Sequence, residues 1–110
     1  MSSSDWDVTF EKSERDGHLV LAVSGEIDLA VAGRFGQELE TLVTDSSGTG
    51  LVDLSGVGFI DSSGVRELLK ARRAAQLAGG ELLLLNPSMA CRRVLEISGV
   101  LSEFSVREAS

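Results

Sequence analysis

The stretch ELLLLN at Glu81–Asn86 narrows the choice of fold for this chain. Leucine favours helices, yet six residues between Gly79-Gly80 and Pro87 leave no room for a helix. A short, continuous apolar run between such turn residues is typical of a strand buried on both faces, as the strands of a parallel sheet are. The sequence therefore predicts a sheet with helices packed on it.

Periodicity and turn residues predict the elements that precede this strand. Alternating apolar and polar residues predict a strand at Val8–Glu14, and the turn at Arg15–Gly17 joins it to a second strand, HLVLAVSG, in a hairpin. Apolar residues at helical spacing predict a first helix after Asp28, which is a good N-cap. A second helix is predicted from Ser63 and ends at Gly79-Gly80.

Two more strands and a third helix complete the pattern. LVDLS at Leu51–Ser55 is predicted as a strand followed by a tight bend at Gly56–Gly58, and EFSV at Glu103–Val106 as the last strand. Pro87 suits the first turn of a third helix, with Asn86 as its cap. The predicted order is β-β-α-β-α-β-α-β, which is an α/β fold with a mixed, mostly parallel sheet of about five strands.

The composition indicates one domain that does not bind nucleic acid. A chain of 110 residues is the size of a single domain. Its net charge of −7 argues against nucleic-acid binding, which requires a basic patch on the protein surface. One cysteine, no export signal and no apolar run of bilayer length predict a cytoplasmic, non-membrane protein. Residues 1–7 are expected to be a flexible N-terminus, with the domain at 8–110.

Motifs for catalysis and for metal or nucleotide binding are missing. The histidine His18 opens the second strand and no GxSxG motif occurs, so Ser62 and Ser63 have no evident base. Neither glycine-rich phosphate-binding fingerprint occurs, and acidic pairs such as Glu26-Asp28 lack the spacing of a calcium loop. Cys91 lies on the apolar face of the third helix and is predicted to be structural. We expect no catalytic residue, no metal and no cofactor.

Two acidic junctions are the remaining candidates for function. GEID at Gly25–Asp28 ends the second strand, and DSSG at Asp61–Gly64 follows the third. Because each leads into a helix, both helix N-termini are predicted at the same end of the sheet. A helix N-terminus favours negative charge, which would help to hold a phosphate on Ser62. The alternative is that Ser62 or Ser63 simply caps the second helix.

The segments VSGEIDLAVAGRF, LVDLSGVGFIDSSGVRELL, AGGELLLLNPS and VLEISGV, in this order, resemble a STAS domain from about Val8 to Val106. They are similar in particular to the bacterial anti-sigma factor antagonists that act by partner switching. The GEID and DSSG segments at this separation, followed by the Gly-Gly, strand and Asn-Pro block, are far more specific together than any one of them alone. The resemblance implies a single STAS-type domain.

The resemblance also implies a function and its partners. In that family the unphosphorylated antagonist binds an anti-sigma factor that is also an ATP-binding serine kinase, and this binding frees a sigma factor for transcription. The kinase then phosphorylates the antagonist, the complex dissociates, and a PP2C-type phosphatase resets the system. Carried over to this chain, the phosphorylation site is Ser62, and Ser63 is the neighbouring hydroxyl that is not the acceptor. The implied partner-binding residues are Gly25, Glu26, Asp28, Asp61, Ser62, Ser63 and Gly64.

Two departures and one alternative accompany the resemblance. Gly33 stands where many relatives carry proline, and Arg66 stands where a small glycine is frequent. The charged side chain of Arg66, one turn into the helix, bears on which kinase docks. STAS domains also serve without a phosphoswitch, as adaptors in lipid-transport complexes and transporters or as scaffolds of stressosome type. The intact acceptor serine favours the antagonist.

Overall fold

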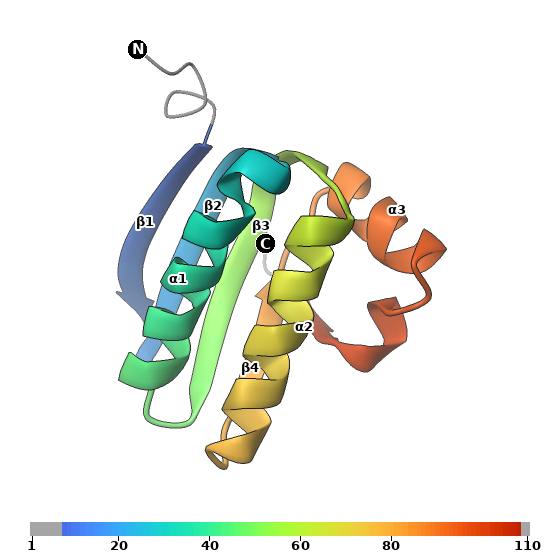
Figure 1. Ribbon diagram of the computed structural model, residues 1–110. Helices are drawn as coiled ribbons and strands as arrows, with labels where there is room; N and C mark the ends of the chain where they lie inside the picture. The colour runs from blue at the N-terminus through green and yellow to red at the C-terminus, as the bar shows by residue number, and fades with distance from the viewer. Residues whose placement is uncertain (1–7, 109–110) are drawn as a thin grey trace.

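The computed structural model describes residues 8–108, and the expected flexible tail at residues 1–7 lies outside them. Strands and helices follow one another in the predicted order, with a short 3-10 turn, η2, before the last strand (Figure 1). The elements are β1 (Val8–Arg15), β2 (His18–Ile27), α1 (Leu29–Asp45), β3 (Thr49–Ile60), α2 (Ser62–Leu77), β4 (Glu81–Leu85), α3 (Met89–Ile97), η2 (Leu101–Glu103) and β5 (Ser105–Arg107).

The described strands form one mixed sheet in the order β1-β2-β3-β4-β5. β1 and β2 form the predicted antiparallel hairpin, and every other neighbouring pair is parallel. The predicted α/β fold with a mostly parallel sheet is therefore confirmed. β4 has the expected character, because its leucines from Leu82 to Leu85 are buried on both faces of the sheet.

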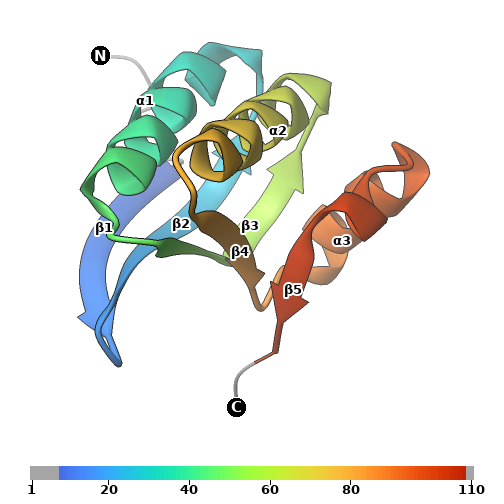
Figure 2. The same ribbon diagram turned by 90° about the horizontal axis from the view of Figure 1, so that it is seen from below.

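Helices α1 and α2 lie side by side over the same face of the sheet, and α3 lies beyond α2 on the side of β5 (Figure 2). The main core fills the space between these helices and the sheet. Its side chains without exposed surface are Leu21, Ile27, Phe35, Leu39, Val52, Leu54, Leu68, Leu84, Cys91 and Leu95. A smaller cluster of Val20, Leu51 and Leu83 lies on the opposite face, as the alternation of strand side chains requires.

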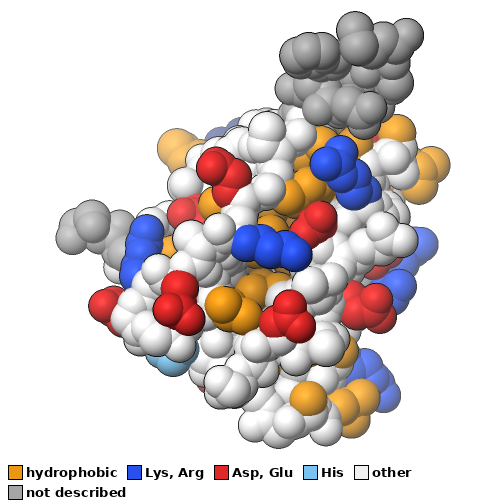
Figure 3. Space-filling model, turned by 90° about the vertical axis from the view of Figure 1, so that its left-hand side faces the viewer, with side chains coloured by type: hydrophobic (Ala, Val, Ile, Leu, Met, Phe, Trp, Pro, Cys, Tyr) orange, Lys and Arg blue, Asp and Glu red, His pale blue; other side chains and the backbone are white. Residues whose placement is uncertain are grey.

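β1 is one edge of the sheet, and its exposed side chains are charged. Glu11, Lys12, Glu14 and Arg15 are all exposed, and the face that carries β1 shows charges of both signs close together (Figure 3). Lys12 also pairs with Glu38 of α1 at 3.8 Å. Charges on an edge strand oppose pairing with another chain, so this edge is protected against aggregation.

β3 is longer than the sequence predicted. It continues from Thr49 to Ile60, and the expected bend at Gly56–Gly58 is part of the strand. The pairing of β2 with β3 contains two register shifts in this region, which are typical of β-bulges. A Cβ on Gly56 would lie 2.4 Å from the Ser24 hydroxyl, so this glycine permits a close approach of the strands rather than a turn.

The start of α3 also differs from the prediction. Asn86 has φ +46° and Pro87 precedes the helix, so Ser88 is the N-cap and the helix begins at Met89. The Ser88 hydroxyl accepts the Cys91 N–H at 3.1 Å and donates to the Val57 carbonyl at 2.5 Å. Because a single serine satisfies both contacts, it caps α3 and fixes it against β3. At the end of the chain, Glu103 belongs to η2, and β5 begins at Ser105.

Candidate functional site

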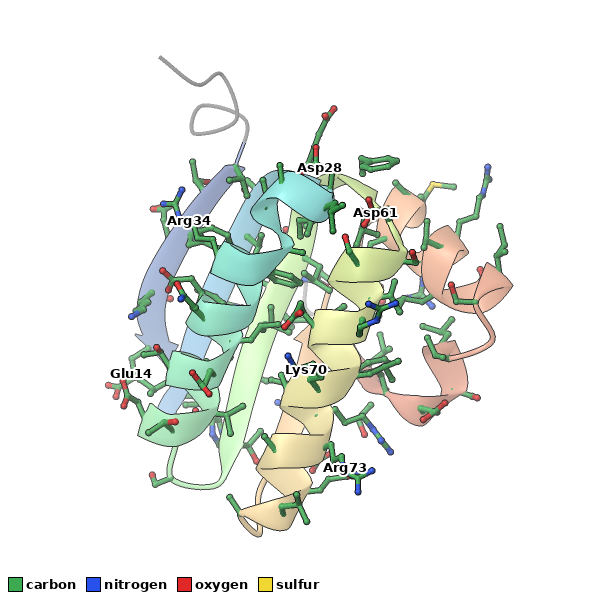
Figure 4. All side chains as sticks on the ribbon, in the orientation of Figure 1. Glu14, Asp28, Arg34, Asp61, Lys70 and Arg73 are labelled. Carbon is green, nitrogen blue, oxygen red and sulfur yellow. The ribbon has the colours of Figure 1, made fainter. Side chains whose placement is uncertain are left out.

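The two acidic junctions meet at the end of the sheet formed by the C-termini of β2 and β3; this end is called the site edge below. Ile27 of β2 pairs with Ile60 of β3, so Asp28 and Asp61 follow directly from paired residues. The Asp61 N–H donates to the Ile27 carbonyl at 3.2 Å, which joins the two junctions. Asp28 and Asp61 lie at the same end of the molecule, each at the start of its helix (Figure 4). The expected placement of both helix N-termini at one end is therefore correct.

Asp28 caps α1 as predicted, since its Oδ1 accepts the Val31 N–H at 3.3 Å. Gly25 and Glu26 belong to the end of β2, which continues two residues beyond the predicted strand to Ile27. Gly25 has φ +108°, a conformation that glycine adopts without strain, and it lies at one of the two register shifts. Glu26 is exposed and pairs in register with Phe59 of β3, so its backbone lies two residues from Asp61 at the end of the strands.

Asp61 is the N-cap of α2, so the alternative in which Ser62 or Ser63 caps this helix is wrong. The helix begins at Ser62, and Asp61 Oδ1 accepts the N–H groups of Ser63 at 3.0 Å and Gly64 at 3.4 Å. Aspartate is among the best capping residues, and it directly follows a strand here, so the sequence contained this signal. The cap fixes the backbone that carries the two serines.

The environment of Asp61 keeps its carboxyl group ionised. The Ser63 hydroxyl donates a hydrogen bond to Asp61 Oδ1, and this bond is the largest cause that lowers the pKa of Asp61 below its ordinary value. Partial desolvation acts in the opposite direction, and N–H groups of the helix start lower the pKa further. The candidate site therefore contains a fixed negative charge beside both serines.

The two serines of the DSSG segment differ in accessibility. Ser63 is half-buried, and its hydroxyl is bound to Asp61. Ser62 is exposed, and within residues 8–108 its hydroxyl has no hydrogen-bond partner. A transferase that approaches the site edge would meet the Ser62 hydroxyl without having to break an internal hydrogen bond.

Gly64 lets α2 start close to the sheet. A Cβ at this position would lie 2.7 Å from Ile60 Cγ1 and 2.9 Å from Ile27 Cγ2, and both isoleucines are fully buried. A larger residue would therefore push the first turn of α2 away from the ends of β2 and β3. Gly64 thus positions Ser62 at the site edge.

Three exposed apolar side chains lie at the site edge, and the sequence did not single them out. Leu29 is the first residue of α1 and is 77% exposed, Phe59 near the end of β3 is 45% exposed, and Met89 at the start of α3 is 80% exposed. The contact between Ser88 and Val57 holds Met89 next to this end of β3. Leu29, Phe59 and Met89 are called the apolar rim below. Large apolar side chains that are exposed together mark surfaces for protein binding.

Serine catalysis, thiol chemistry, metal binding and membrane spanning each set requirements that the described residues can be compared with. His18 lies at the opposite end of β2, about 30 Å from the DSSG segment by strand length, so it cannot act as a base for Ser62. Burial raises the pKa of Cys91 to about 11, as expected for a structural thiol. Residues 8–108 hold no cluster of metal-ligand side chains. No helix in this range is both long and apolar enough to cross a membrane.

Comparison with known proteins identifies the family. The sequence pattern of the STAS domain matches residues 9–110, so the chain belongs to the STAS domain family. No sequence among the curated proteins matches it significantly. Among solved structures, an anti-sigma factor antagonist from Mycobacterium paratuberculosis shares 29% sequence identity, with a TM-score of 0.80. The match covers 90% of this chain and 84% of that one.

The anti-sigma factor antagonist SpoIIAA is similar in two solved forms. Its unphosphorylated form shares 25% identity, covers 93% of this chain and 89% of its own, and has a TM-score of 0.74. Its phosphorylated form, from Bacillus, shares 25% identity, covers 93% of this chain and 92% of its own, and has a TM-score of 0.69. This chain therefore has the fold of anti-sigma factor antagonists, which are regulators and not enzymes.

Proposed function

We propose that this chain is an anti-sigma factor antagonist and that phosphorylation of Ser62 switches its binding off. The observation that carries the proposal is the difference between two adjacent hydroxyls. Ser63 is bound to Asp61, whereas Ser62 is exposed and without a partner at the site edge. The existence of SpoIIAA in an unphosphorylated and a phosphorylated form supports a switch of this kind in the same fold.

The proposed partner is an anti-sigma factor that is also an ATP-dependent serine kinase. In the phosphorylation step, Ser62 Oγ forms a bond to the γ-phosphorus of ATP, ADP leaves with the electron pair of the broken bond, and a base of the kinase takes the hydroxyl proton. A phosphatase of the PP2C type reverses the change by adding water and releasing inorganic phosphate. The antagonist itself supplies only the acceptor and the docking surface.

The apolar rim gives the unphosphorylated form a surface to bind with. Leu29, Phe59 and Met89 lose water when a partner covers them, and such buried side chains supply much of the energy of an interface. A phosphate on Ser62 adds a charge of about −1.5 to −2 beside the ionised Asp61. Burying this charge at an interface costs free energy unless the partner neutralises it, so phosphorylation weakens the complex.

The test is a pull-down from the native cell lysate with three baits: wild type, Ser62→Asp and Ser47→Asp. Ser47 is exposed in the loop between α1 and β3, at the opposite end of the sheet, and controls for the added charge. We expect wild type and Ser47→Asp to retain an ATP-binding kinase that Ser62→Asp loses. When the wild-type chain is incubated with that kinase and ATP, we expect phosphorylation at Ser62, which mass spectrometry can map.

Two results would speak against the proposal. If all three baits retain the same proteins, Ser62 is not a switch, and the identity of those proteins decides between an adaptor and a scaffold. If the kinase phosphorylates a Ser62→Ala variant as readily as wild type, the acceptor lies elsewhere in the chain. Circular dichroism of the Ser62→Asp protein checks that the fold is retained.

A further inference from the structure

We propose that Arg66 is the intramolecular counter-ion of the phosphate on Ser62, paired with it across one turn of α2. The proposal rests on the function proposed above, which makes Ser62 the acceptor. Ser62 and Arg66 are four residues apart in α2, and both are exposed. Residues at this spacing are neighbours on one helix face, with Cβ atoms about 6 Å apart.

The direction of helical side chains brings the two groups together. Each side chain in a helix leans toward the N-terminus, so Arg66 leans toward Ser62. An acid that precedes a base by four residues is also the more favourable order of such a pair. The planar guanidinium group can donate two parallel hydrogen bonds to phosphate oxygens, which a lysine cannot do.

Arg66 has no competing partner among residues 8–108. No ion pair involves it there, and its neighbours at three and four residues along the helix are Ser62, Ser63, Leu69 and Lys70, none of which is acidic. The adjacent Glu67 is engaged with Lys70 at 3.5 Å and lies against Gly36 of α1. Arg66 is therefore available to a new anion on its own face.

The charges around the phosphate give this pairing a consequence. Asp61 and Asp28 lie at the same end of the molecule and repel an added phosphate. The next cation along the helix, Lys70, is one turn beyond Arg66 and therefore further from Ser62. Pairing with Arg66 offsets this repulsion and keeps the start of α2 folded. It also withdraws an exposed cation from the partner-facing surface, so phosphorylation changes that surface by more than the charge of the phosphate alone.

The proposal can be tested on the full chain with phosphoserine placed at position 62 during synthesis by a suppressor tRNA. The ³¹P chemical shift is followed against pH for the wild-type sequence, Arg66→Gln and Arg73→Gln. Arg73 is exposed on the same face of α2 as Ser62 but lies about 16 Å from Ser62 along the helix axis, so it controls for the loss of a positive charge.

The Arg66 pair favours the dianion, so the titration midpoint, about pH 6 for a free phosphoserine, is expected to rise by about 0.2 to 0.4 of a pH unit in Arg66→Gln. Arg73→Gln is expected to leave the midpoint unchanged, and about 1 M salt to remove most of the difference between wild type and Arg66→Gln. Equal midpoints for wild type and Arg66→Gln would overturn the proposal, as would an equal rise in Arg73→Gln.

Because the phosphate is built in during synthesis, this result is independent of whether a kinase finds Ser62. If the midpoints are equal but the kinase phosphorylates Ser62, the proposed function stands and the role of Arg66 falls. If the midpoint rises in Arg66→Gln but no kinase modifies Ser62, the ion pair is real and the proposed function falls.

Discussion

Asp61 determines the local geometry of the candidate site at the scale of single residues. Its carboxylate accepts hydrogen bonds from the N–H groups of Ser63 and Gly64 and from the Ser63 hydroxyl, and this leaves Ser62 as the accessible serine. Removing the Asp61 side chain would therefore both weaken the start of α2 and release Ser63. The distinction between the two serines depends on one neighbouring side chain.

Replacing Asp61 by alanine is expected to lower the free energy of unfolding by about 1 kcal/mol at neutral pH, because the N-cap is lost. The folded-state pKa of Asp61 is lowered, so its stabilisation is fully present above the unfolded pKa, near pH 4, and is lost as the pH falls through the folded pKa. Urea unfolding of both proteins between pH 7 and pH 3 measures this. Equal stability at pH 7 would show that Asp61 does not stabilise the helix.

The sequence predicted the secondary-structure elements well, and its errors lie where distant segments meet. Strand β4 could be predicted because its leucines stand between unambiguous turn residues. The extent of β3 could not, because the glycines at 56 and 58 read as a bend until β2 lies beside them. The cap of α3 was misplaced for a similar reason, since Ser88 is fixed by the carbonyl of Val57 on another element.

Two glycines in helices are expected to respond in opposite directions to replacement by alanine. Gly64→Ala brings a Cβ within 3 Å of two buried isoleucines and is expected to destabilise the fold by about 1 to 3 kcal/mol. Gly33→Ala in α1 meets no atom within 4 Å and is expected to stabilise it by about 1 kcal/mol through helix propensity. Thermal unfolding measures the stability of both variants relative to wild type. A stabilised Gly64→Ala protein would contradict the close packing of α2 on the sheet.

The whole molecule brings together at the site edge features that are far apart in the sequence. That the DSSG and GEID segments lie at the same end of the sheet could be predicted because each carries its own signal at a strand end. The apolar rim could not, because Leu29, Phe59 and Met89 belong to different elements and become neighbours only through the parallel sheet and the Ser88 contact. Ser62 as the acceptor remains a prediction, supported by its exposure.

The apolar rim is expected to contribute directly to partner binding. Met89→Ala removes a side chain that is 80% exposed and is expected to weaken binding of the captured kinase by about tenfold with little change in stability. Leu77→Ala is the matched control, since Leu77 is 79% exposed at the far end of α2. Isothermal titration calorimetry compares the two variants, and an equal effect of both would show that the rim is not the docking surface.

The most direct measurement of the proposed switch is the affinity of the captured kinase for two forms of the purified full chain, one unmodified and one with phosphoserine at position 62. Titration calorimetry without ATP keeps both forms unchanged during the measurement. We expect the unmodified chain to bind and the phosphorylated chain to bind at least about 100-fold more weakly, because a dianion beside Asp61 would have to be buried. Equal affinities would show that phosphorylation of Ser62 does not control binding.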